Sequence, residues 1–82
     1  MALKRFAWDM GKNLKLKLER GVSFEDVYLR IQNGAYHTKK NPSKNHKGQR
    51  LFLVTINGKL YAVPFTEFED HFFLRTIYEI RL

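Results

Sequence analysis

The clearest hydrophobic pattern in the chain is a pair of β-rich runs on either side of Asn57-Gly58. Residues 51–56 and 59–65 are rich in β-branched and aromatic side chains. An Asn-Gly pair between two such runs is typical of a two-residue type I′ hairpin turn. This pattern predicts that Ile56 pairs with Lys59. The same register places Val54 opposite Tyr61, Phe52 opposite Val63 and Arg50 near Phe65.

Two helices are predicted before the hairpin. Met10, Leu14 and Leu18 recur every four residues, as on a helix, although residues 14–18 also alternate like a strand. Asp9 is a good N-cap and Gly21 a good stop, so we expect a helix over residues 10–20.

The second helix is specified by its caps. Ser23 and Asp26 have the spacing of a capping box, and Asn33-Gly34 favours a left-handed end. Between these signals, Phe24, Val27, Tyr28 and Ile31 fall on one helical face. We therefore expect a helix over residues 24–32.

The remaining segments complete an α+β domain. Residues 3–8 and 35–38 are expected to form short strands, residues 39–48 an exposed cationic loop, and residues 72–82 a last strand. The predicted fold is one domain, residues 1–82. It has two N-terminal helices packed on one face of a twisted antiparallel sheet, in the order β-α-α-β-β-β.

Side-chain alternation also predicts which face of the sheet the helices cover. One face of the hairpin is small and almost wholly apolar, and we expect it to meet the helices: Leu51, Leu53, Thr55, Leu60, Ala62 and Pro64. In the last strand the helix-covered set is Leu74, Thr76, Tyr78 and Ile80. The open side then carries Arg50, Tyr61, Arg75, Glu79 and Arg81, together with the apolar Phe52, Val54 and Val63, which would need a cover.

Composition narrows the function. The 82 residues contain no cysteine, so disulfides, thiolate metal sites and cysteine nucleophiles are excluded. His37 and His46 lack a metal-ligand spacing, and no metal or other cofactor is expected. No apolar run approaches a membrane span and no signal sequence is evident, so we expect a soluble cytoplasmic protein with no membrane partner.

The charge is concentrated in the middle of the chain. Residues 27–66 carry seven Lys and Arg and no acid, which equals the whole net charge of +7. A concentration of positive charge favours binding to a polyanion such as nucleic acid. An acidic protein partner is equally compatible with this charge.

The opening of the chain resembles the motif F-x-W-D-x-x-K-N followed by R-G-V-S-F-E-D-V of BrnT-like toxins. These are small bacterial ribonucleases of the RelE/ParE superfamily. The residues that carry the resemblance are Phe6-Ala7-Trp8-Asp9, Lys12-Asn13 and the run from Arg20 to Val27. The hairpin and the segment Phe73-Leu74-Arg75-Thr76-Ile77 with Arg81 are similar to one subgroup. The resemblance implies a RelE/BrnT-like fold. It also implies an RNA-cleaving toxin of a type II toxin–antitoxin pair, inhibited by an antitoxin that often has a ribbon-helix-helix region. A toxin dimer within a hetero-oligomer fits the same expectation.

Metal-free RNA cleavage needs a base for the 2′-OH, cations for the phosphate and an acid for the leaving oxygen. We expect Arg81 and Arg75 to clamp the phosphate, because a guanidinium matches its oxygens. His46 is the candidate acid or base, Glu79 an alternative base, and Tyr61 a candidate phenol. The expected RNA-backbone contacts are Lys39, Lys40, Lys44, Lys47 and Arg50.

Two other functions remain open from the sequence. One is a non-enzymatic module that grips nucleic acid or an acidic protein through residues 39–50. The other is a ParE-like toxin that acts on a protein target such as a topoisomerase.

Overall fold

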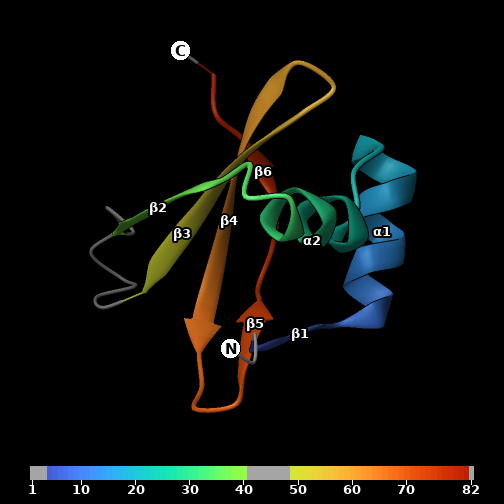
Figure 1. Ribbon diagram of the computed structural model, residues 1–82. Coiled ribbons are helices and arrows are strands. Elements are labelled where there is room, and N and C mark those ends of the chain that lie inside the picture. Colours follow the sequence, from blue (N-terminus) through green and yellow to red (C-terminus); the bar gives the residue numbers. More distant parts are fainter. Residues whose placement is uncertain (1–3, 41–48, 82) are drawn as a thin grey trace.

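A computed structural model describes residues 4–40 and 49–81 of the chain. Two helices lie on one side of a six-stranded sheet (Figure 1). The elements are β1 (Arg5–Trp8), α1 (Met10–Arg20), α2 (Phe24–Gln32), β2 (His37–Lys40), β3 (Arg50–Ile56), β4 (Lys59–Glu67), β5 (His71–Leu74) and β6 (Tyr78–Glu79). The strand order is β1-β5-β4-β3-β2, and β6 pairs with β4. The α+β class and the two helices are as predicted.

The hairpin register is confirmed. Asn57 and Gly58 have φ of 53° and 78°, the left-handed conformations that a type I′ turn requires. Ile56 accordingly faces Lys59, and the pairing continues without a slip to Arg50 opposite Phe65.

The predicted helix caps are also confirmed. The Asp9 carboxylate accepts a hydrogen bond from the Gly11 amide, and Gly21 ends α1 with a left-handed φ of 69°. Ser23 and Asp26 form a complete capping box at the start of α2. Each cap satisfies backbone groups that a helix end leaves unpaired.

A buried asparagine joins the two helices. The Asn13 side chain on α1 is 6% exposed; its oxygen accepts a hydrogen bond from the Phe24 amide at 2.8 Å, and its nitrogen donates to Glu25 at 2.7 Å. The second bond lowers the pKa of the Glu25 carboxyl. The first turn of α2 is therefore held by a side chain of α1.

Two strand predictions need correction. β1 pairs with β5 in parallel, so the sheet is mixed and not wholly antiparallel. β2 begins at His37, two residues later than expected. The amides of Gly34 and Ala35 bond back to the carbonyls of α2, which delays the departure of the chain from the helix.

The predicted last strand is interrupted by a bulge. Leu74 pairs with Phe65 but Tyr78 pairs with Ala62, so four positions along this segment match three along β4. One extra residue reverses the alternation of everything that follows it. Ile77 therefore becomes fully buried, although the sequence placed it on the open side.

The helices cover the opposite hairpin face from the one predicted. Phe52, Val54, Val63 and Phe65 are all buried and belong to the same core cluster as Leu16, Val22, Phe24 and Val27 of the helical region. The sequence analysis assigned the face with the smaller apolar side chains to the helices. The face with the larger side chains packs there instead, because burying it removes more apolar surface from water. Tyr61 goes with them into the core, and the expected cover over Phe52 is the helical layer itself.

No helix within residues 4–40 and 49–81 combines the length and the apolar character needed to cross a membrane.

We predict that Asn13→Ala destabilises the fold by about 1–3 kcal/mol, because it leaves the buried Phe24 amide without its acceptor. Urea unfolding followed by circular dichroism measures this. The matched control is Asn33→Ala, because Asn33 is an exposed residue at the end of α2; it should change stability by no more than about 0.5 kcal/mol. Equal effects of the two variants would contradict the role given to Asn13.

Candidate nucleic-acid interface

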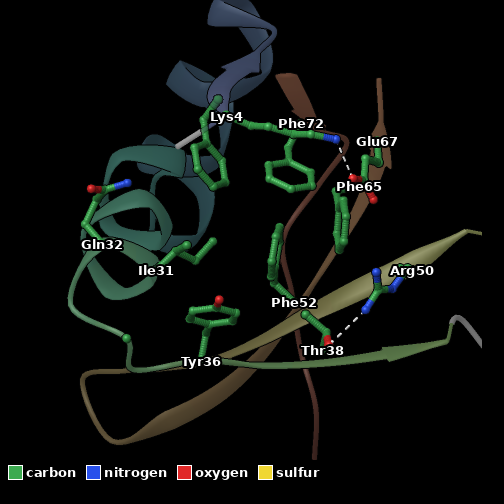
Figure 2. Close-up of a pocket in the computed structure, with 12 residues that line it drawn as sticks. Lys4, Ile31, Gln32, Tyr36, Thr38, Arg50, Phe52, Phe65, Glu67 and Phe72 are labelled. Carbon is green, nitrogen blue, oxygen red and sulfur yellow. Dashed lines mark hydrogen bonds and ion pairs between the residues drawn. The ribbon is translucent and has the colours of Figure 1, made fainter. Parts of the chain in front are cut away.

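A pocket of about 490 Å³ opens beside the C-terminal end of α2, on the helical side of the sheet (Figure 2). Its inner wall is mostly aromatic, and its rim is polar and charged. The aromatic wall consists of Phe6, Tyr36, Phe52, Phe65 and Phe72. The polar rim consists of Lys4, Gln32, Thr38, Arg50 and Glu67. We call this feature the aromatic pocket.

The aromatic wall is a connected stack of rings. Phe52 and Phe65 stack with centroids 4.0 Å apart and planes 17° apart. Phe72 meets both rings edge-on, and Tyr36 meets Phe52 edge-on at 5.6 Å. Phe52 and Phe65 are nearly inaccessible to water, whereas Tyr36 is 39% exposed. The stacked pair of Phe52 and Phe65 forms the floor of the pocket, and Tyr36 is its most exposed ring.

One side of the rim is an ion pair that crosses the sheet. The Lys4 ammonium donates to the Glu67 carboxylate and, at 3.0 Å, to the Phe68 carbonyl. The same ammonium lies 5.2 Å from the centre of the Phe72 ring. Lys4 precedes β1, and Glu67 ends β4. The two therefore meet because β1 and β4 both flank β5.

The other side of the rim is Arg50, at the first position of β3. Its guanidinium donates to the Thr38 hydroxyl at 3.1 Å (Figure 2). Lys40 pairs with Arg50 across β2 and β3 and shares its face of the sheet, whereas Lys39 pairs with Leu51 on the other face; both lysines are exposed. Two of the predicted RNA-backbone contacts, Arg50 and Lys40, thus lie at one corner of the sheet, beside the pocket.

The charges on the rim interact. The hydrogen bond from Lys4 lowers the pKa of the Glu67 carboxyl below its ordinary value; slight desolvation opposes this, and the charges of Lys4 and Arg50 add to it. Glu67 is therefore ionised at neutral pH, between two cations.

The structure does not bring Arg75 together with Glu79 and Arg81. Arg75 donates to the Thr66 hydroxyl at 3.0 Å and lies over the Phe73 ring, on the sheet face away from the helices. The bulge after Leu74 separates it from Glu79, which pairs with Tyr61 on the helical side. Thr66 and Tyr61 are five residues apart along β4, which is about 17 Å in a strand.

Three of the predicted catalytic residues do lie together. Glu79 pairs with Tyr61 across β6 and β4, and the Arg81 guanidinium lies 3.8 Å from the Glu79 carboxylate. Tyr61 is only 6% exposed within the core, whereas the Arg81 side chain is exposed. Arg50, which the sequence grouped with them, lies at the aromatic pocket instead. His46, Lys44 and Lys47 lie outside the described residues.

Lys4, Tyr36 and Glu67 are the pocket residues that the sequence did not indicate as functional. Glu67 lies between the predicted hairpin and the predicted last strand, and Lys4 lies within the predicted first strand. Lys4 and Glu67 come together because β1 pairs in parallel with β5, and the local sequence carries no signal for that pairing. The aromatic residues were visible in the composition, but their face was assigned wrongly.

Ligands for a metal ion do not gather in the part of the chain that the structure describes; it contains no group of three or more His, Asp or Glu placed to share an ion. Two cations, one carboxylate and the Tyr36 phenol instead surround the aromatic wall of the pocket. This arrangement suits a planar ring that carries a phosphate.

Comparison with protein-family models gave no match, and comparison with curated proteins gave none either.

We predict that Lys4→Gln raises the pKa of Glu67 toward its ordinary value, because the substitution removes the donor that stabilises the carboxylate. Carboxyl ¹³C NMR titration measures this directly. Lys12→Gln makes the same charge change on α1, where Lys12 has no ion pair with a described residue, and should leave Glu67 unchanged.

The lowered pKa of Glu67 also makes the stability of the fold depend on pH. Because the folded-state pKa of Glu67 is lowered, its contribution to stability is present above the unfolded-state pKa and is lost as pH falls through the folded-state pKa. Lys4→Gln should therefore flatten the pH dependence of unfolding in the acid range. An unchanged Glu67 titration in Lys4→Gln would show that the ion pair does not form in solution.

Proposed function

We propose that this protein binds single-stranded RNA at the aromatic pocket and cleaves it without a metal ion. The observation that carries the proposal is that an aromatic wall and two cations, Lys4 and Arg50, line the same pocket. A nucleobase stacks on an aromatic ring whatever its identity, and the adjoining phosphates pair with the cations.

Single-stranded RNA fits this pocket better than duplex nucleic acid does. An unpaired base can leave its stack and enter a pocket, whereas bases inside an A-form helix are not accessible. Lys40, directly opposite Arg50 and on the same face of the sheet, extends the positive charge from this corner onto β2. We propose that the backbone of the strand follows this corner while one base occupies the aromatic pocket.

The cleavage step uses the carboxylate on the same rim. Glu67 accepts the proton of the ribose 2′-OH, and the 2′-oxygen attacks the adjacent phosphorus. The bond from phosphorus to the 5′-oxygen breaks, and that oxygen takes a proton from the Tyr36 hydroxyl, which points into the pocket (Figure 2). The products are a 2′,3′-cyclic phosphate and a free 5′-OH. Arg50 and Lys4 stabilise the charge that builds on the phosphate oxygens.

We propose further that the cleavage acts as a toxin, inhibited by a cognate antitoxin, in the cytoplasm of a bacterium. This rests on the resemblance of the opening motif and not on the pocket. Expressing the chain with and without its neighbouring reading frame tests it: growth arrest relieved by the neighbour is expected, and harmless expression alone would contradict it.

A second candidate is a non-enzymatic RNA-binding module. It is favoured by the separation of Arg75 from Arg81, which leaves the phosphate clamp expected from the sequence unassembled. The two candidates share the aromatic pocket and differ only in whether the bound strand is cut.

We predict that Tyr36→Leu weakens binding of a fluorescent single-stranded RNA about tenfold, because stacking on one aromatic side chain is worth about 1–3 kcal/mol. Fluorescence anisotropy measures the affinity. Tyr78→Leu is the matched control: Tyr78 is 38% exposed, almost as Tyr36 is, but lies on the opposite face of the sheet. Equal losses in the two variants would refute base stacking in the aromatic pocket.

We predict that Arg50→Gln lowers the affinity about tenfold and reduces the salt dependence of binding by about one phosphate contact. Lys59→Gln removes the same charge at the hairpin turn, next to Glu79, and should leave both quantities nearly unchanged. Identical salt slopes for wild type and Arg50→Gln would remove Arg50 from the interface.

For cleavage, we predict that Glu67→Gln abolishes the formation of 2′,3′-cyclic phosphate ends from RNA incubated in EDTA, while RNA binding is retained. Glu69→Gln, in the turn that follows β4, is the control and should cleave normally. Salt-sensitive binding by the wild type with no cleavage at all would select the binding-module alternative. If Glu67→Gln still cleaves RNA but Arg81→Ala does not, the catalytic residues are those expected from the sequence and not those of the aromatic pocket.

A further inference from the structure

The outward side of α1 carries a stripe of exposed apolar side chains. Met10, Leu14 and Leu18 recur every four residues and are 82%, 58% and 79% exposed. The buried residues of the same helix are Asn13 and Leu16, which lie about 100° and about 160° round the helix from Leu14. We call the three exposed residues the α1 stripe.

The α1 stripe contributes nothing to the core. The helix is held by its caps, by the Asn13 bonds to α2 and by the bond from Arg20 to the Ile77 carbonyl. Three large apolar side chains in a row on a solvent-facing helix are therefore not explained by folding. A contiguous exposed apolar surface typically marks an interaction site.

Cations border the α1 stripe. Lys15 lies one turn before Leu18 on one border of the stripe and has no hydrogen bond or ion pair with any described residue. Lys17, on the other border, pairs with Glu25 at 3.4 Å. Within α1, four Lys and Arg side chains stand against the single acid Glu19. The border thus offers unsatisfied positive charge beside apolar surface.

We propose that the α1 stripe docks one acidic amphipathic helix of a partner protein. Leucines of the partner would pack between Met10, Leu14 and Leu18, and its flanking carboxylates would pair with Lys15 on one border and Lys17 on the other. This surface is separate from the aromatic pocket and does not depend on the function proposed for it.

The width and charge of the stripe favour this occupant over two others. A stripe one side chain wide is a seam for a single helix, whereas a membrane-binding helix needs a broad apolar face, commonly with aromatic residues. A second copy of the chain would bring the Lys-rich border of α1 against itself, and like charges across an interface are unfavourable.

The experiment uses the full chain and a fluorescein-labelled synthetic peptide of about 18 residues, helical, with leucines every three or four positions and Glu on both flanks. Anisotropy should show saturable binding that weakens when salt is raised from about 50 mM to about 500 mM. The double variant Leu14→Gln/Leu18→Gln should bind at least about tenfold more weakly. Gln keeps a helix propensity close to that of Leu, so the fold should persist, as circular dichroism can verify.

Two controls separate the α1 stripe from general stickiness. Leu29→Gln removes an equally large exposed leucine, 56% accessible, from α2 and should change the affinity less than about twofold. A peptide with Lys in place of every Glu should bind at least about tenfold more weakly to the wild type. Lys15→Gln should reduce both the affinity and its salt dependence, whereas Lys12→Gln, on the far side of α1, should change neither.

The proposal is overturned if the Leu14/Leu18 double variant binds the acidic peptide as tightly as the wild type, or if the Lys peptide binds equally well. It is also overturned if sedimentation shows a wild-type dimer that the double variant abolishes. Vesicles of phosphatidylcholine and phosphatidylglycerol provide the last arm: binding to them through the α1 stripe, with no binding to the acidic peptide, would assign the surface to a membrane instead.

Discussion

The register of the β3–β4 hairpin is the constraint on which the rest of the structure depends. Because side chains alternate along a strand, a slip of one residue would exchange the two faces completely. The left-handed Asn57 and Gly58 fix the register within two residues. That register keeps Phe52, Val63 and Phe65 on one face of the hairpin, together with Arg50 at the far end of β3. When this face packs against the helices, Arg50 comes to lie next to the aromatic pocket.

The aromatic pocket exists because the helical layer is shorter than the sheet it covers. α2 ends at Gln32, and the amides of Gly34 and Ala35 close its last turn. The aromatic face of β3 and β4 extends past that end, so Phe52 and Phe65 form the edge of the core and the inner wall of the pocket together. These two rings therefore belong both to the hydrophobic core and to the binding site proposed for the pocket. Tyr36 is the pocket ring that can be changed without opening the core, because it is already partly exposed.

Local signals in the sequence predicted local structure well, whereas the candidate site depends on choices that are not local. The Asp9 and Ser23 caps and the Asn57-Gly58 turn each act within a few residues, and each is confirmed. Two faces of the hairpin were both apolar enough to be buried, and only their packing against α2 decides between them. One inserted residue after Leu74 then reversed the predicted sides of Ile77 and Glu79. Arg75 and Arg81 were grouped on the assumption of an uninterrupted strand, and Lys4 was missed because its partner lies across β5.

The two-sided character of α1 explains its ambiguous sequence and bears on how a partner would act. Residues 14–18 alternate like a strand because Leu16 serves the core while Leu14 and Leu18 face the solvent.

α1 meets the Glu25 end of α2, whereas the aromatic pocket adjoins its Gln32 end. Seven residues of helix separate these ends by about 10 Å, which is close to the screening length at physiological ionic strength. A helix docked on the α1 stripe would therefore leave the mouth of the pocket open and its charges largely unaltered, so a partner that blocks RNA binding has to reach the Arg50 corner with a second segment.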